Sequence, residues 1–76
     1  MSTWISSSLE ILGGKPCIKG TRISVEHILE LFASGATRET TLEAYPQVSA
    51  AALDAVFEYS AKALRNEGIW KIKVQA

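Results

Sequence analysis

A single cysteine, Cys17, in a chain of 76 residues removes two supports on which many small proteins depend. One thiol cannot form an intrachain disulfide, and it excludes a cysteine-rich zinc site. A chain this short buries only a modest share of its surface when it folds alone. Its apolar content of 47% is enough for a packed core and argues against disorder. We therefore expect a single domain over residues 1–76 that gains further support as a homodimer.

The first ten residues, MSTWISSSLE, contain neither a cationic start nor a long apolar run, so they do not resemble a signal peptide. The sequence has no stretch near the roughly 18 uninterrupted apolar residues that a membrane-spanning helix needs. These features predict a cytoplasmic protein with no membrane partner, in which Cys17 stays a free thiol.

Residues 4–23 have the pattern of short extended segments separated by turns, which predicts a β-ribbon. Gly13-Gly14 and Lys19-Gly20 are typical turn pairs, and the glycine of the second pair is expected to take a positive φ. Between the turns, Cys17-Ile18 and Arg22-Ile23 can pair as a tight ribbon. A ribbon of this size needs helices or a partner chain to stabilise it.

Helical periodicity begins after the ribbon. Apolar residues recur at i, i+3, i+4 and i+7 from Val25 to Phe32, the spacing of a helix with one apolar face. Similar patterns predict further helices, each preceded by a Ser or Thr that can cap its free amides. The expected helices are Val25–Ser34 after Ser24, Arg38–Tyr45 after Thr37, and Ala50–Asn66 after Ser49. The third is expected to bury Leu53, Val56, Phe57, Ser60 and Leu64.

A short strand is predicted over residues 69–74, where apolar side chains alternate with Lys71 and Lys73. Trp4-Ile5, in the same subunit or in a neighbour, is its expected mate. The large apolar residues of the two ends are either ordinary core or an interface with a second copy or a partner. We favour the interface, because the ends of a three-helix unit do not naturally lie inside it. Its expected residues are Trp4, Ile5, Trp70, Ile72 and Val74.

The eight basic residues balance the eight acidic ones, so the net charge gives no support to nucleic-acid binding. The charges are unevenly distributed, however. Lys15, Lys19 and Arg22 lie between Gly13 and Ile23 with no acidic residue among them. Exposed amides of the glycine turns and these cations could hold a DNA phosphate. Alternatively, the glycines only permit tight turns and the cations are solvated.

Cys17 and His27 suggest a thiol nucleophile with its base, but no third residue to orient them is evident. The chain contains a single histidine, and no further ligands with suitable spacing accompany it. Cys17 therefore fits better as a small buried apolar residue. We expect no catalytic activity, no metal site and no cofactor.

The most distinctive stretch is GGKPCIKGTRISVEHILELFASGAT, followed by Tyr45-Pro46 at the end of the next helix. It closely resembles a large prokaryotic group of short proteins, the domain-of-unknown-function family four-thirty-three, over about residues 4–65. The resemblance implies a mainly α, trihelical, homeodomain-like or winged-helix-like fold with an N-terminal β-ribbon. Members are often described as VapB-type antitoxins encoded beside a PIN-like ribonuclease toxin. DNA binding and toxin neutralisation are what this resemblance implies.

The helix pair over residues 37–65 has the length and turn of a helix-turn-helix, in which the second helix enters the major groove. The start of this second helix forms a poor base-reading surface, because within the helix it lacks the arginine, asparagine or glutamine that makes bidentate base contacts. Asp54 would also repel phosphates. The alternative is a three-helix scaffold without groove contacts. If DNA is bound, the expected contacts are Lys15, Lys19, Arg22, Arg38, Gln47 and Ser49.

Two functions follow from these observations. The first is a type II antitoxin that binds a PIN-like toxin and its operator DNA, which the family resemblance and the basic ribbon favour. The second is a protein-interaction module that does not touch DNA, which the neutral charge and the poor reading surface favour.

Overall fold

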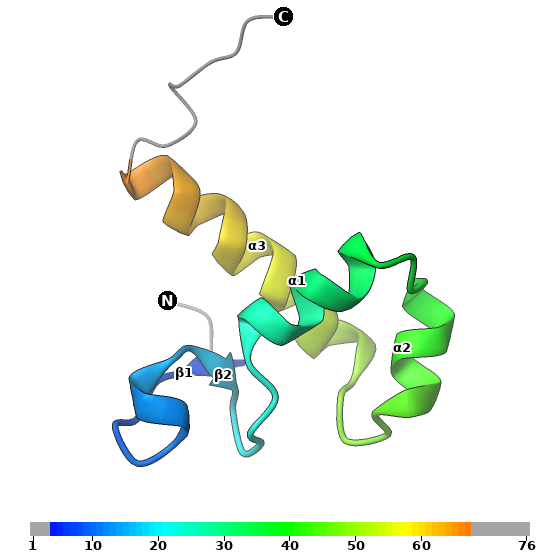
Figure 1. Cartoon of the computed structure of the whole chain (residues 1–76), viewed down its shortest axis with the longest axis horizontal. Coiled ribbons are helices and arrows are strands. Elements are labelled where there is room, and N and C mark those ends of the chain that lie inside the picture. Colours follow the sequence, from blue (N-terminus) through cyan, green and yellow to red (C-terminus); the bar gives the residue numbers. More distant parts are fainter. Residues whose placement is uncertain (1–3, 68–76) are drawn as a thin grey trace, which may run out of the picture.

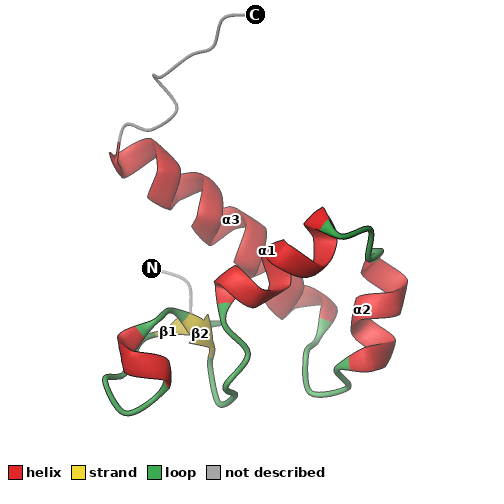
Figure 2. Ribbon diagram, in the orientation of Figure 1, coloured by secondary structure: helices red, strands yellow, loops and turns green. Residues whose placement is uncertain are grey.

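The computed structural model describes residues 4–67, in which a β-hairpin is followed by three helices (Figure 1). The described chain is mainly helical, as the sequence predicts (Figure 2). The predicted strand at 69–74 lies outside the described residues. The elements are β1 (Ile5–Ser6), the one-turn 3-10 helix η1 (Leu12–Gly14), β2 (Cys17–Ile18), α1 (Val25–Ala33), α2 (Arg38–Ala44) and α3 (Ala50–Glu67).

The strand β2 has partners on both of its edges. It pairs antiparallel with β1, with Ile5 opposite Ile18. On the other edge the Ile18 amide donates to the Ile23 carbonyl at 2.9 Å, and Cys17 forms an isolated bridge with Ser24. The predicted pairing across the Lys19-Gly20 turn is therefore present. The segment at Ile23-Ser24 thus lies along one edge of β2, and β1 lies along the other edge.

Two details of the N-terminal region differ from the predictions. Ile5 is buried in the core as the partner of β2, so its side chain is not available at a surface. Gly13 and Gly14 do not form a hairpin turn. They complete η1 with φ values of 68° and 95°, after Leu12 with a φ of 53°. The connection from β1 to β2 is longer than a two-residue turn, and the left-handed residues fold it into a compact loop.

All three predicted caps are present. The Ser24 hydroxyl accepts from the His27 amide at 2.9 Å, and the Ser49 hydroxyl accepts from the Ala52 amide at 3.1 Å. Thr37 forms a capping box with Thr40 at the start of α2. The helices end within one residue of the predicted positions, because Gly35 and Pro46 stop the first two by local stereochemistry.

The core lies where the first half of α3 meets the hairpin and α1. Its fully buried apolar side chains are Ile18, Ile28, Leu53 and Val56. The predicted face of α3 is partly wrong. Phe57 and Leu64 are 38% and 48% exposed, whereas Ala52 and Ala55 are buried. Small alanines let neighbouring segments approach closely on that side, so the buried stripe is rotated away from the larger residues.

We expect Gly20→Val to lower the free energy of unfolding by about 1 kcal/mol. Gly20 has a φ of 82°, and a Cβ built there meets no atom within 4 Å. The penalty is therefore backbone strain alone. Gly20→Asn is the matched control and should lose less, because asparagine tolerates the left-handed region. Urea denaturation followed by circular dichroism measures the difference. Equal stability of the valine variant and the wild type would contradict the turn geometry.

Candidate nucleic-acid interface

The four cations predicted to contact DNA fall into two groups. Lys15 Nζ lies 2.9 Å from Glu26 Oε1, and Arg38 Nη1 lies 2.8 Å from Asp54 Oδ1. Lys19 and Arg22 form no ion pair within residues 4–67. Two of the four positive charges are therefore matched by carboxylates, and the other two are open to a ligand.

The pair Lys15–Glu26 joins the loop before β2 to the first turn of α1. The hydrogen bond that Lys15 donates to Glu26, followed by the negative charge of Glu26, raises the pKa of Lys15 above its ordinary 10.5. Both side chains are more than half exposed, so water and salt weaken the attraction. A phosphate at Lys15 would have to compete with this carboxylate.

The stability supplied by this pair should depend on pH in one direction. Because the folded pKa is raised, the contribution is fully present below pH 10.5 and is lost as the pH rises through the folded pKa. Lys15→Gln should therefore be less stable than the wild type at neutral pH and equal to it in strong alkali. Urea midpoints at several pH values measure this. The ion-pair explanation would be contradicted if the difference in stability persisted after the lysine had deprotonated. It would also be contradicted if added salt left that difference unchanged.

Arg38 connects the two helices of the predicted helix-turn-helix. Its Nη1 pairs with Asp54, and its Nη2 donates to the Ala50 carbonyl at 3.5 Å. The first residue of α2 is thus tied to the first turns of α3. This contact neutralises Asp54, which the sequence suggests would repel phosphates. Arg38 acts here as a link that positions α3 relative to α2.

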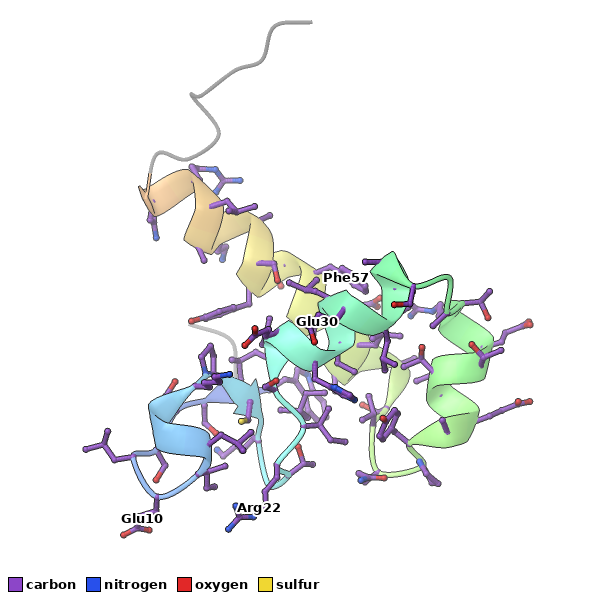
Figure 3. All side chains as sticks on the ribbon, in the orientation of Figure 1. Glu10, Arg22, Glu30 and Phe57 are labelled. Atoms are coloured by element: carbon purple, nitrogen blue, oxygen red, sulfur yellow. The ribbon has the colours of Figure 1, made fainter. Side chains whose placement is uncertain are left out.

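The turn that carries Lys19 and Arg22 is held by hydrogen bonds. The Thr21 hydroxyl donates to the Ile18 carbonyl at 2.8 Å and accepts from the Ile23 amide at 3.0 Å. Both cations lie on its exposed surface, and Arg22 extends from the turn into solvent (Figure 3). Two exposed charges are therefore presented by a backbone turn that hydrogen bonds hold in place.

The connection between α2 and α3 lies at the same edge of the molecule as this turn, at the bottom of Figure 1. Gln47 and Ser49, the other predicted DNA contacts, belong to this connection and are exposed. The Ser49 hydroxyl is already used to cap α3 through the Ala52 amide. Ser49 therefore contributes to this edge through the N-terminus of α3 that it caps. Gln47 contributes an exposed side-chain amide that can form hydrogen bonds.

An open hollow of about 450 Å³ separates the Arg22 turn from the end of α2. His27 and Tyr45 line it, with His27 Nε2 2.9 Å from Tyr45 Oη and the two rings at 89°. Sequence reasoning missed this pair, since eighteen residues separate its members. Glu26 and Glu30 face the same hollow as Arg22, so its charge is mixed. The hollow therefore shows no preference for an anion.

The residues that suggest thiol chemistry are engaged elsewhere. Cys17 is buried, and its thiol donates to the Lys15 carbonyl at 3.4 Å, whereas His27 binds Tyr45. Among residues 4–67, no group of three or more His, Cys, Asp or Glu side chains could hold a metal ion. In the same part of the chain, no helix has the length and apolar character needed to cross a membrane.

The predicted interface residues differ in exposure, and three of the five lie outside the described residues. Trp4 is 41% exposed, and Ile5 is buried. Trp70, Ile72 and Val74 lie outside the described residues. Leu9, which the sequence did not single out, is 87% exposed and is the most exposed large apolar side chain described.

Comparison with known proteins identifies a family and a curated relative. A family model described as a protein of unknown function (DUF433) matches residues 5–60. An uncharacterized protein, y4eO, of Sinorhizobium fredii (strain NBRC 101917 / NGR234) is 41% identical over 46 residues. That alignment covers 60% of this chain and only 21% of the relative. No solved structure gives a significant match.

Proposed function

The chain belongs to the DUF433 family of proteins of unknown function, and from this premise we propose that it is a DNA-binding antitoxin of a type II toxin–antitoxin pair. Its partners in this proposal are a PIN-like toxin, its own operator DNA and a second copy of itself. The supporting observation is the fixed turn that presents Lys19 and Arg22 at the same edge of Figure 1 as the α2–α3 connection. Within residues 4–67 neither cation has a carboxylate partner.

Binding in this proposal is mainly to the DNA backbone. Lys19 and Arg22 reach phosphates, and the N-terminus of α3 adds the favourable end of its dipole. The exposed first turns of α3 carry Ala51 and the paired Asp54, which provide little hydrogen-bonding readout of bases. We therefore expect strong dependence on salt and modest discrimination between sequences.

The direct test is a fluorescence anisotropy titration with the DNA upstream of the protein's own gene. Affinity should rise as salt is lowered, and a duplex of equal length and scrambled order should bind more weakly. The adjacent gene product should be added in a second series. Failure to bind DNA at low salt, with and without that product, would contradict the proposal.

Self-association is part of the proposal, because two copies double the number of cations that face DNA. Exposed Trp4 and Leu12 give the small chain apolar surface beyond its core. Light scattering at micromolar concentration should give about twice 8.3 kDa. A monomer that unfolds in one cooperative transition would contradict this expectation.

The two ion pairs favour a second candidate function, a protein-interaction module that does not bind DNA. Glu26 and Asp54 neutralise two of the four candidate cations, and the whole chain has no net charge. This alternative predicts a complex with the adjacent gene product and no salt-dependent binding of any duplex. The anisotropy and partner-binding series together distinguish the two functions.

A further inference from the structure

An apolar groove of about 280 Å³ runs between the first turns of α1 and the distal half of α3. In Figure 1 this half of α3 projects beyond α1 and the hairpin. The apolar lining comes from Pro16, Val25, Leu29, Tyr59, Ala63 and Leu64. Leu29 and Leu64 are exposed in the described chain, so the groove is an unpartnered continuation of the core.

We propose that residues 69–74 of the same chain occupy this groove, with Trp70, Ile72 and Val74 against its wall. This proposal goes beyond the proposed function, since it requires neither DNA nor a toxin. It assigns the C-terminal apolar residues to an intramolecular contact, which leaves other surfaces for self-association.

The groove lies within immediate reach of this segment. Leu64, at its outer end, precedes the last residue of α3, Glu67, by less than one helical turn. The next residue is Gly68, and glycine is the residue best suited to reverse the chain after a helix. A connection this short gives the segment a much higher effective concentration at its own groove than a second copy can reach.

The spacing of the segment matches the spacing of the groove. Alternate residues of an extended strand are about 6.6 Å apart, because each residue rises about 3.3 Å. Residues four apart on a helix are about 6.0 Å apart. In an extended conformation directed back along α3, Trp70 and Ile72 would therefore meet Leu64 and Ser60 in succession.

The polarity of the two surfaces also agrees. Ser60 lines the groove, and its hydroxyl donates to the Val56 carbonyl at 2.8 Å. Covering the groove therefore leaves this hydroxyl with its hydrogen-bond partner. Lys71 and Lys73 alternate with the apolar residues and would face solvent, so no charge needs to be buried. Lys15 and Glu26 also line the groove, and both side chains are more than half exposed, so their ion pair can remain hydrated.

The test uses the full chain with the substitution Trp4→Phe. Because the sequence has two tryptophans, Trp70 is then the single fluorescent tryptophan. Trp70 should show blue-shifted emission and severalfold slower acrylamide quenching than the same chain unfolded in urea. Both properties should persist as the protein is diluted until light scattering and gel filtration give a monomer. Circular dichroism checks that the helices of the variant are intact.

A matched pair of alanines on α3 locates the contact. Ala63 lines the groove, whereas Ala61 is exposed outside it. Ala63→Glu should raise the quenching of Trp70 severalfold, and Ala61→Glu should leave it unchanged. Leu64→Ser, at a side chain already half exposed, repeats the test if Ala63→Glu loses helical structure.

Three results would overturn the proposal. A Trp70 that is quenched as fast in the folded chain as in urea is not docked. Protection that disappears on dilution assigns the groove to a segment of a second copy. Equal loss of protection in Ala61→Glu and Ala63→Glu places the contact elsewhere. None of these results depends on DNA, so they are separate from the outcome of the anisotropy titration.

Discussion

Leu53→Ala is expected to lower the free energy of unfolding by about 2–5 kcal/mol. Leu53 is completely buried where α3 meets the hairpin and α1. Its replacement removes apolar contact and leaves a cavity that a small, tightly packed core fills only in part. Folded domains are stable by only about 5–15 kcal/mol, and small ones lie at the lower end. The variant should therefore lose much of its stability and be partly unfolded at moderate temperature.

Leu9→Ala is the matched control, because it makes the same chemical change at a side chain that is 87% exposed. Its effect should stay within about 0.5 kcal/mol. Urea denaturation followed by circular dichroism gives both values from the shift of the midpoint. Equal midpoints for the two variants would contradict the location of the core, and a large effect at Leu9 would indicate an interface at the N-terminal loop.

The helices could be predicted from the sequence because their signals are local. Ser24, Thr37 and Ser49 cap the residues immediately after them, and Gly35 acts on the residues next to it. Such signals operate through one turn of backbone, whatever surrounds it. Fold class and helix bounds followed from them.

The pairing of β1 with β2 could not be predicted, because it is a contact between distant residues. Trp4-Ile5 was expected to pair with the C-terminal strand, whereas within the described residues Ile5 pairs with Ile18. The buried face of α3 was misjudged for a related reason. The hydrophobicity of Phe57 predicted that it would be buried. Burial is decided instead by how closely neighbouring segments approach α3, and the residues buried there are Ala52 and Ala55.

The candidate site was predicted as a set of cations, and the structure divides that set. Sequence reasoning counted Lys15 with Lys19 and Arg22, since all three are in one stretch. The partner of Lys15, Glu26, is eleven residues away and becomes a neighbour only when α1 packs beside the ribbon. A charge count along the sequence cannot show which cations are already paired.

That division leads to the prediction with the largest effect on DNA binding, the double variant Lys19→Ala and Arg22→Ala. In a dimer it removes up to four phosphate contacts, each worth a slope of about −0.9 in log affinity against log salt. The slope should therefore flatten by roughly three to four units. Over a fourfold rise in salt, the wild type should lose about a hundredfold more affinity than the variant. Anisotropy titrations at several salt concentrations measure both slopes.

The control is Lys62→Ala, because Lys62 is an exposed cation on the distal half of α3, away from the turn that carries Arg22. Its slope should equal that of the wild type if the contacts come from the turn. Lys15→Ala should flatten the slope less than Arg22→Ala, since Glu26 already competes for Lys15. Equal flattening in Lys62→Ala and Arg22→Ala would show that net charge matters rather than a defined site. An unchanged slope in the double variant would place the DNA contacts on a different surface.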